Sequence, residues 1–238
     1  MKAYDTILFD ADGTLYDFDK SEANALSEVL TLCGIPDDDE TVELYHRIND
    51  AEWKALERGE TTRERLKLAR FEKLKTALCE RGIAVAHEAQ HMCNLYVERL
   101  SAQCILLPDA EDVCRILSES YRLCIITNGI THVQKSRFSR SPITKYIDRM
   151  FISDEMGTVK PERRDFELVF EALGMTFDEA AQRCLVVGDS LTSDIKGAVN
   201  AGIDSCWYDP RGGEAKCITP TYTIRALTDL YDLLRRQT

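Results

Sequence analysis

The feature that most constrains the fold is a short apolar run near the N-terminus that ends abruptly in acidic residues. Residues 7–9 are Ile, Leu and Phe, followed directly by Asp10 and then by Asp12 and Gly13. An unbroken apolar run of this length is typical of a strand buried on both faces, as in a parallel sheet. Strand geometry would place the Asp10 and Asp12 side chains on the same side. Two close carboxylates repel unless a cation or a proton lies between them, although a solvated turn is the alternative interpretation.

Most of the first half of the chain has a helical pattern. From residue 17 to about residue 104, apolar residues recur at helical spacing, which predicts four helices and no strand. Thr61 and Glu64 predict a capping box at the start of the third helix. The acidic run 37–40 is interpreted as the solvated start of the second helix.

After Pro108 the pattern changes to short buried strands that alternate with helices, which indicates a parallel sheet. The strands are expected at residues 5–9, 123–127, 150–153, 184–188 and 205–208, with a further short one at 222–224. The helices are expected near residues 111–118, 166–173, 194–201 and 224–234. The sequence therefore predicts an α/β fold, with a Rossmann-like core of residues 1–16 and 105–238 and helices on both faces of its sheet. An all-helical cap domain of residues 17–104 is inserted after the first strand.

Composition and charge exclude several classes of protein. The chain has 238 residues, of which 44% are hydrophobic, so it can bury a sizeable core. No apolar run approaches the length of a bilayer span and the N-terminus lacks a signal-peptide pattern, so we expect a cytoplasmic protein with no membrane partner. A net charge of −11 argues against a nucleic-acid polymer as partner, but a small phosphate ligand can be neutralised locally.

The cysteines and histidines form no recognisable metal-ligand motif. The nine cysteines include no CxxC pair and mostly lie in apolar segments, so we expect reduced core residues. His87 and His91 are spaced i,i+4 with no companion ligand motif beside them, and we interpret them as part of a polar helix face.

Four polar clusters accompany the predicted strands. They comprise residues 10–17, Thr127-Asn128-Gly129, Lys160, and Asp189 with Asp194. Because open parallel sheets bind ligands at the carboxyl ends of their strands, we expect the four clusters to meet in one crevice. Each is ambiguous alone, since Thr-Asn-Gly is a common turn, Lys160 could be a surface residue and Asp194 could be a helix N-cap.

Together, the clusters resemble the four motifs of the haloacid dehalogenase (HAD) superfamily of phosphohydrolases. The matching strings are FDADGTLYD, ITNG, VKPERRDF and GDSLTSD. The resemblance covers the whole chain and implies that the helical segment is the cap inserted after the first motif. The runs ISDEMGTVKPERRDF and AGIDSCWYDPRG are similar to the branch of pyrimidine 5'-nucleotidases that act on nucleoside monophosphates.

The resemblance implies a phosphatase that works through an aspartyl-phosphate intermediate with Mg²⁺ as cofactor. It implies Asp10 as the nucleophile, with its other oxygen on the metal. Asp12 would be the acid and base, and its backbone carbonyl would also bind the metal. Asp189 would complete the metal site, and Asp194 would either join it or hold Lys160 in place. Lys160 is thus counted among the catalytic residues.

The same resemblance implies that Thr127, the Asn128 backbone and Lys160 bind the transferring phosphate. The expected substrate is a small phosphorylated metabolite, most simply a nucleoside 5'-monophosphate. A phosphomutase of sugar phosphates is an alternative that shares these motifs but must exclude water from the intermediate. A dehalogenase needs no metal, and a non-catalytic phosphate-binding module would be expected to have lost carboxylates that this chain retains.

Overall fold

The computed structural model describes residues 4–215 and 218–235. The chain divides into two compact units, which we call the core unit (residues 1–18 and 105–238) and the helical unit (residues 19–104). That these are separate domains, with a boundary at residues 16 and 17 and another at 104 and 105, stays a prediction.

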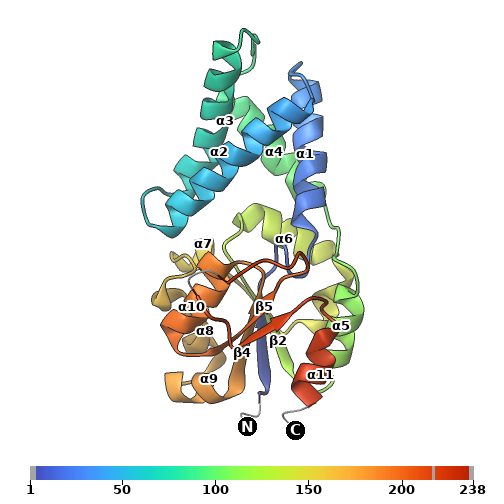
Figure 1. Cartoon of the computed structure of the whole chain (residues 1–238), viewed down its shortest axis with the longest axis vertical. Helices are drawn as coiled ribbons and strands as arrows, with labels where there is room; N and C mark the ends of the chain where they lie inside the picture. Colours follow the sequence, from blue (N-terminus) through green and yellow to red (C-terminus); the bar gives the residue numbers. More distant parts are fainter. Residues whose placement is uncertain (1–3, 216–217, 236–238) are drawn as a thin grey trace. The chain divides into compact units, whose positions relative to one another are not determined.

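A six-stranded sheet forms the centre of the core unit, in the order β3-β2-β1-β4-β5-β6 (Figure 1). Its strands are β1 (Thr6–Phe9), β2 (Arg122–Thr127), β3 (Arg149–Ile152), β4 (Cys184–Gly188), β5 (Asp204–Tyr208) and β6 (Tyr222–Ile224). Every neighbouring pair is parallel, and all residues of β1 and β4 are buried. Because the strands run the same way, their carboxyl ends share one edge of the sheet.

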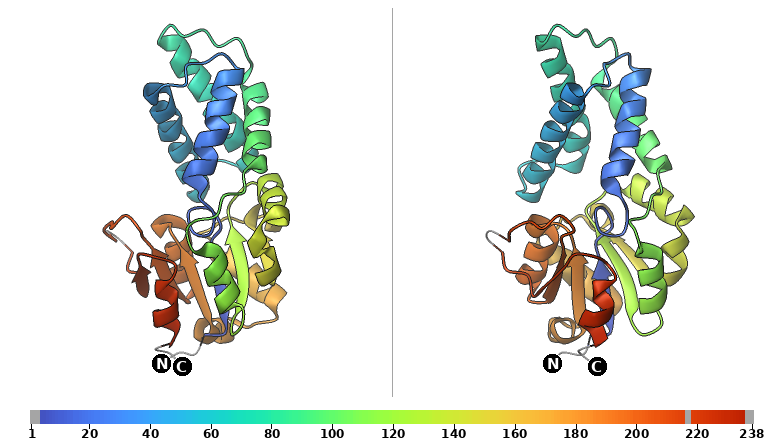
Figure 2. Two further views of the ribbon diagram at one scale, coloured as in Figure 1. Left: turned by 90° about the vertical axis from the view of Figure 1, so that its right-hand side faces the viewer. Right: turned by 45° about the vertical axis from the view of Figure 1, so that its right-hand side comes forward.

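Helices cover both faces of this sheet (Figures 1 and 2). One face packs against α8 (Arg163–Leu173), α9 (Phe177–Arg183) and α10 (Lys196–Ala201), in a core that includes Leu8, Ile126 and Phe166. The other face carries α5 (Ala110–Leu117) and α11 (Asp229–Arg235). Burial on both faces explains why the strands have unbroken apolar sequences, and the predicted α/β parallel-sheet fold is confirmed.

Backbone hydrogen bonds within the core unit join the segments that lead into and out of the helical unit. Tyr16 forms an isolated antiparallel bridge with Leu106. The Asp17 N–H donates to the Ile105 carbonyl oxygen and the Leu107 N–H donates to the Leu15 carbonyl oxygen, each at 2.9 Å. The outgoing and returning segments are therefore hydrogen-bonded to each other within the core unit.

The helical unit contains α1 (Phe18–Leu32), α2 (Asp39–Glu57), α3 (Arg63–Glu80) and α4 (Ala89–Ala102), and no strand occurs between residues 19 and 104. Asp38 caps α2 by accepting the Thr41 N–H at 2.8 Å, as expected for the acidic run. Tyr45, Phe71 and Tyr96 are fully buried, with ring centroids 5.5 to 5.7 Å apart. This aromatic cluster anchors the packing of the unit.

Several element boundaries differ from those expected. Thr62, rather than Thr61, caps α3 by accepting the Arg65 N–H, so the predicted capping box with Glu64 is wrong. The last helix begins at Asp229 instead of near residue 224, because residues 222–224 belong to β6. Four helical segments were not predicted: α6 (Thr131–Arg140), η1 (Pro142–Tyr146), α7 (Ser153–Met156) and α9. They are short or mostly polar and lack a long apolar period.

The cysteines and histidines also differ in part from expectation. In the described residues eight cysteines are free, of which all but Cys79 and Cys104 are buried, and Cys217 lies outside the described residues. His87 precedes α4, so the interpretation of His87 and His91 as one helix face is wrong. None of the helices in residues 4–215 and 218–235 is long and apolar enough to cross a membrane.

Candidate active site

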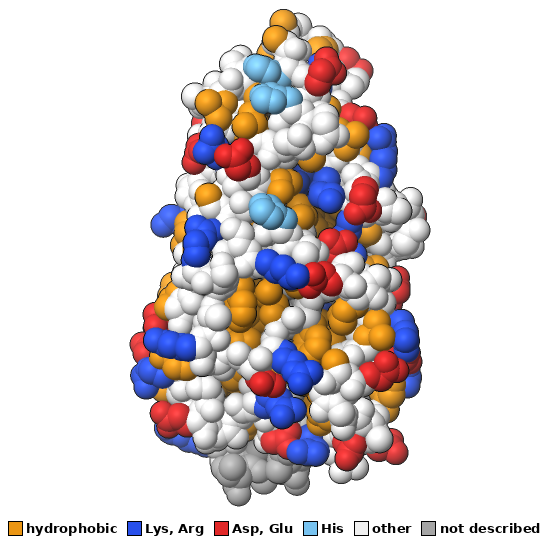
Figure 3. Space-filling model, turned by 180° about the vertical axis from the view of Figure 1, so that it is seen from behind, with side chains coloured by type: hydrophobic (Ala, Val, Ile, Leu, Met, Phe, Trp, Pro, Cys, Tyr) orange, Lys and Arg blue, Asp and Glu red, His pale blue; other side chains and the backbone are white. Residues whose placement is uncertain are grey.

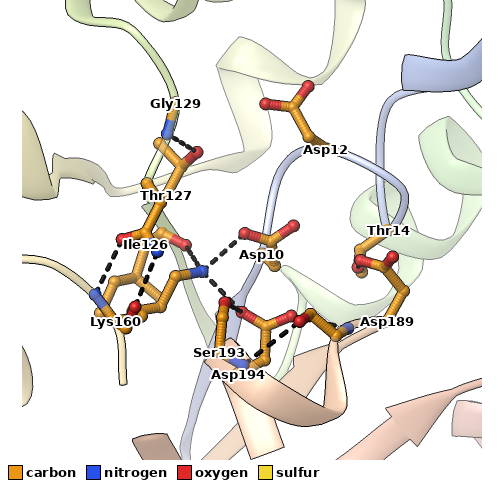
Figure 4. Close-up of polar contacts among 12 residues, drawn as sticks. Asp10, Asp12, Thr14, Ile126, Thr127, Gly129, Lys160, Asp189, Ser193 and Asp194 are labelled. Atoms are coloured by element: carbon orange, nitrogen blue, oxygen red, sulfur yellow. Dashed lines mark hydrogen bonds and ion pairs between the residues drawn. The ribbon is translucent and has the colours of Figure 1, made fainter. Parts of the chain in front are cut away.

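The predicted site residues meet at the carboxyl edge of the sheet (Figure 4). Asp10 follows β1, Thr127 is the last residue of β2 and Asp189 follows β4. Lys160 lies before α8, and Asp194 lies in the short π-type helix η2 (Leu191–Ile195). The parallel topology thus brings together residues that are far apart in the sequence, as expected for this edge of an open sheet.

Lys160 is the cation at the centre of the cluster. Its Nζ donates to Asp10 Oδ1 and Asp194 Oδ1, both at 2.6 Å, and to the Ile126 carbonyl oxygen at 2.8 Å. The side chain is fully buried, so the surface interpretation of Lys160 is excluded. Burial alone would lower the pKa of Lys160, but the two carboxylates outweigh it and raise the pKa above its ordinary value. The Lys160 ammonium therefore has all three of its hydrogens engaged in hydrogen bonds.

The carboxylates around Lys160 form a compact oxygen cluster. One oxygen from each of Asp10, Asp189 and Asp194 lies within 4.8 Å of the other two. Burial raises the pKa of Asp10 well above its ordinary value, Lys160 opposes this rise and the neighbouring carboxylates add to it. Burial, followed by Asp194, raises the pKa of Asp189 to about 7. Bringing these groups together favours a bound divalent cation, and the oxygen donor set fits Mg²⁺.

Asp194 is held by hydrogen bonds on both oxygens. Oδ1 accepts from Lys160, and Oδ2 accepts the Ser190 N–H at 3.0 Å. Ser190 itself caps η2 by accepting the Ser193 N–H at 3.2 Å, so Asp194 is not the N-cap. These contacts favour the second of the two expected roles, in which Asp194 holds Lys160 in place.

Asp12 lies apart from the carboxylates around Lys160 (Figure 4). Because β1 ends at Phe9, strand alternation does not determine where the Asp12 side chain points, and its place on the same side as Asp10 stays a prediction. Arg137 Nη1 lies 2.7 Å from Asp12 Oδ1, and Gln134 Nε2 donates to Asp12 Oδ2 at 2.6 Å. Asp12 is therefore held by a second group of residues.

Gln134 and Arg137 were not identified from the sequence. Both lie on α6, and Arg137 Nη2 donates to Gln134 Oε1 at 2.7 Å. Arg137 is buried, and its guanidinium carbon lies 4.1 Å from the centroid of the Tyr16 ring. The Gln134 side chain occupies the space that a side chain at position 129 would fill, because a Cβ at Gly129 would lie 1.9 Å from Gln134 Nε2. The available signal was a Gln and an Arg at i,i+3 just after the ITNG string.

The predicted phosphate-binding residues are fixed by local hydrogen bonds. Thr127 Oγ1 accepts the Gly129 N–H at 3.0 Å. The Asn128 amide pairs with the Lys160 backbone, donating from Nδ2 to its carbonyl oxygen at 2.9 Å and accepting its N–H at 2.8 Å. The Asn128 side chain therefore positions Lys160, and its backbone is the group that can face a ligand.

Gly13 explains how the first motif approaches the fourth. It has a φ of 83°, a backbone conformation that residues other than glycine rarely adopt. A Cβ at this position would lie 2.6 Å from Asp189 Oδ2. Asp189 is also held by the Thr14 hydroxyl, which donates to its Oδ1 at 3.2 Å. The DGT sequence therefore allows the loop after β1 to contact Asp189 closely.

This arrangement agrees with a family comparison. Residues 4–202 match the model of the haloacid dehalogenase-like hydrolases. The chain belongs to this family. The prediction of a HAD-superfamily enzyme is therefore confirmed.

Relatives within the HAD family are similar over almost their full length. The chain is 34% identical over 234 residues to the pyrimidine 5'-nucleotidase PynA of Streptococcus pneumoniae, covering 97% of this chain and 95% of PynA. It is 30% identical over 232 residues to the pyrimidine 5'-nucleotidase YjjG of Escherichia coli, covering 97% of this chain and 98% of YjjG. The crystal structure of the HAD-hydrolase YfnB from Bacillus subtilis bound to magnesium matches with 35% identity and a TM-score of 0.88, covering 98% of this chain and 99% of YfnB.

Proposed function

We propose that this HAD-family hydrolase is a Mg²⁺-dependent phosphomonoester hydrolase that forms an aspartyl-phosphate on Asp10. The observation that carries the proposal is the buried contact between Lys160 and Asp10 within the carboxylate cluster. A carboxylate that attacks a phosphate brings two anions together, so nearby positive charge is required. Lys160 supplies one such charge, next to the nucleophile.

The residues that would hold Mg²⁺ are Asp10 and Asp189 through their side chains and Asp12 through its backbone carbonyl. When bound, the ion would offset the repulsion between the nucleophile and the phosphate and stabilise charge on the transferring oxygens. The fit rests on the hard oxygen donors of the cluster. Thr127 and the Asn128 backbone would bind the phosphate oxygens, and Lys160, whose hydrogens are engaged by Asp10, Asp194 and the Ile126 carbonyl, would attract them through its charge.

The chain's own residues account for both steps of the hydrolysis. In the first, an Asp10 oxygen bonds to phosphorus, the bond to the ester oxygen breaks, and protonated Asp12 gives its proton to the departing alkoxide. In the second, Asp12 takes a proton from water while that water attacks phosphorus, and the bond to Asp10 breaks to release inorganic phosphate. Arg137 and Gln134 would orient Asp12 and stabilise its carboxylate after it has given up the proton.

The proposed substrates are nucleoside 5'-monophosphates, with pyrimidine nucleotides foremost among small phosphorylated metabolites. Support comes from PynA and YjjG, both pyrimidine 5'-nucleotidases, whose similarity extends over almost the whole chain. It also comes from the strings ISDEMGTVKPERRDF and AGIDSCWYDPRG. That the reaction takes place in the cytoplasm stays a prediction.

The test is phosphate release with Mg²⁺ from a panel that contains UMP, dUMP, dTMP and sugar phosphates. The wild type is expected to prefer the nucleotides, and Asp10→Asn is expected to lose activity by about 10⁴-fold or more, because an amide is a poor nucleophile. Asp148→Asn is a matched control, since Asp148 is half-exposed and paired with Arg122 at 3.4 Å, far from the proposed chemistry.

The outcomes separate the two levels of the proposal. Retention of most turnover by Asp10→Asn would contradict the nucleophile assignment. A strong preference for sugar phosphates would remove the nucleotidase assignment and leave the phosphatase assignment intact. Nucleotide binding without turnover would instead support a non-catalytic phosphate-binding module.

A further inference from the structure

The helical unit contains a second group of metal-ligand side chains, which plays no part in the proposed hydrolysis. Cys33 directly follows α1, His87 lies in the connection between α3 and α4, and His91 lies in the first turn of α4. One ligand atom from each of the three side chains lies within 4.8 Å of the other two. Cys33 is far from His87 and His91 in the sequence, so no local sequence motif indicates that the three side chains lie together.

The three side chains are arranged with the thiol inside and the imidazoles outside. Cys33 is only 6% exposed, whereas His87 is half-buried and His91 is exposed. The two imidazole rings stack with centroids 4.9 Å apart and an angle of 21° between their planes. Figure 3 shows two adjacent histidine side chains at the surface. A bound ion would therefore have protein ligands on its inner side and water on its outer side.

The backbone that carries these side chains is fixed by hydrogen bonds. The Cys33 N–H donates to the Val29 carbonyl oxygen at 2.9 Å, which attaches Cys33 to the end of α1. Lys75 Nζ donates to the His87 carbonyl oxygen at 2.9 Å and lies 3.3 Å from Glu88 Oε1. Both contacts reduce the ordering that binding would require.

The local charges permit a cation next to Cys33. The last turn of α1 has no basic residue, so no side-chain charge there balances the partial negative charge of the helix C-terminus. The ammonium of Lys75, which is near His87, is paired with the carboxylate of Glu88. A cation beside Cys33 is thus favoured by the helix end, and the ammonium of Lys75 has its own counter-ion in Glu88.

We propose that Cys33, His87 and His91 form a binding site for a transition-metal ion of the Zn²⁺ class. Thiolate and imidazole ligands favour Zn²⁺ over Mg²⁺, which prefers oxygen. Three protein ligands and one water complete a four-coordinate site. Tetrahedral Zn²⁺ requires ligand atoms about 3.5 Å apart. The ligand atoms of the three side chains lie within 4.8 Å of one another, so they need to close by at most roughly 1.3 Å. Exposed His91 can do so by side-chain rotation.

Binding exchanges one proton for the metal ion. The sulfur–hydrogen bond of Cys33 breaks, its proton passes to solvent, and the thiolate sulfur and one nitrogen of each neutral imidazole donate electron pairs to the ion. No electron is transferred. The site would connect the end of α1 to the beginning of α4, and Zn²⁺ is therefore expected to raise the unfolding temperature of the protein.

The experiment uses Co²⁺ as a spectroscopic probe in the full-length, metal-free protein, with excess Mg²⁺ present for the carboxylate cluster of the core unit. One equivalent of Co²⁺ is expected to produce the visible bands of a tetrahedral site and a near-ultraviolet thiolate-to-cobalt charge-transfer band, and Zn²⁺ should displace both. Cys33→Ser should abolish the charge-transfer band, and His91→Gln should weaken Co²⁺ binding by at least about tenfold.

Matched controls come from the same unit. Cys79→Ser removes an exposed thiol and His46→Gln removes a histidine outside the group, so both variants should retain the bands. Absence of the charge-transfer band in the wild type, or its persistence in Cys33→Ser, would overturn the proposal. His91 is exposed, so His91→Gln tests the site even if Cys33→Ser fails to fold, and unchanged Co²⁺ affinity in that variant would also overturn it.

Discussion

The core unit and the helical unit both bury a cationic side chain, but they neutralise it in different ways. In the core unit, Lys160 contacts two carboxylates directly at 2.6 Å. In the helical unit, Arg70 donates to Asn49 Oδ1 at 3.1 Å, and Asn49 Nδ2 donates to Glu22 Oε1 at 2.8 Å. The Arg70 guanidinium is therefore connected to the Glu22 carboxylate through the side-chain amide of Asn49.

Aromatic contacts make up part of the difference. The Arg70 guanidinium carbon lies 4.4 Å from the Tyr96 ring centroid and 5.4 Å from that of Phe71, while Arg70 Nε and Nη2 have no hydrogen-bond partner. Stacking of this kind serves packing and tolerates small shifts. Direct charge contacts fix atoms more tightly. The comparison teaches that the core unit holds its buried cation by direct contacts with carboxylates, whereas the helical unit packs its cation mainly against aromatic rings.

Asp12→Asn is the most severe test of the chemistry proposed for the core unit. The amide leaves the backbone carbonyl in place but cannot transfer a proton, so kcat for phosphate release should fall by about 10² to 10⁴. The measurement is steady-state phosphate release at saturating substrate and Mg²⁺, with circular dichroism as the folding control. An unchanged rate would place the acid elsewhere in the core unit.

Lys160→Met tests whether the ammonium of Lys160 is needed to neutralise the buried carboxylates of Asp10 and Asp194. Asp10 and Asp194 would then lose their shared cation, and the free energy of unfolding should fall by about 3–5 kcal/mol. Urea denaturation near neutral pH without added metal measures this loss. A loss well under 1 kcal/mol would show that the buried carboxylates do not depend on Lys160.

Arg70→Met provides the corresponding change in the helical unit. Methionine keeps much of the apolar contact with Tyr96 but leaves the Asn49 carbonyl without its donor, so the expected loss is about 1–3 kcal/mol. Arg65→Met, on the exposed side of the same helix, should change the stability by no more than about 0.5 kcal/mol. A loss for Arg70→Met equal to that for Lys160→Met would erase the proposed difference between the units.

The smallest expected effect concerns His46, which pairs with Glu22, the carboxylate that also accepts a hydrogen bond from Asn49. Its Nδ1 lies 3.1 Å from Glu22 Oε2, and this hydrogen bond raises the pKa of His46, although burial opposes the rise. The folded pKa therefore exceeds the unfolded one, so the stabilisation is complete below about pH 6.5 and is lost as the pH rises through the folded value. The His46 side chain is 43% exposed, which limits the contribution to about 0.5 kcal/mol.

The check is the difference in unfolding free energy between the wild type and His46→Gln, measured at about pH 5.5 and about pH 8.5. The wild type should have its greater advantage at the lower pH. An advantage that is independent of pH, or larger at the higher pH, would contradict the assigned pair.

The sequence predicts the parts of the molecule that rest on local patterns. Unbroken apolar runs locate β1, β2 and β4, and the polar residues that end them identify Asp10, Thr127 and Asp189, because parallel strands share one edge. The orientation of Asp12 could not be predicted, since it depends on the residue at which β1 stops and on a partner helix.

The remaining errors concern contacts that no local pattern records. The sequence of α6, THVQKSRFSR, contains few apolar residues, so neither the helix nor Gln134 and Arg137 could be found by periodicity. The proximity of Cys33 to His87 depends on how α1 and α4 pack. Thr61 and Thr62 are both plausible caps, and the choice between adjacent hydroxyls depends on which residue begins the helix.

The hydrogen-bonded pairing of residues 15–17 with residues 105–107 has a consequence for how such an enzyme can diversify. The pairing fixes both ends of the intervening segment against the sheet that carries Asp10. Insertions, deletions or wholesale exchange within residues 19–104 can then occur as a loop replacement, without transmitting strain to the nucleophile. The junction therefore allows the helical segment to change in length or sequence while the loop after β1 keeps its hydrogen bonds to residues 105–107.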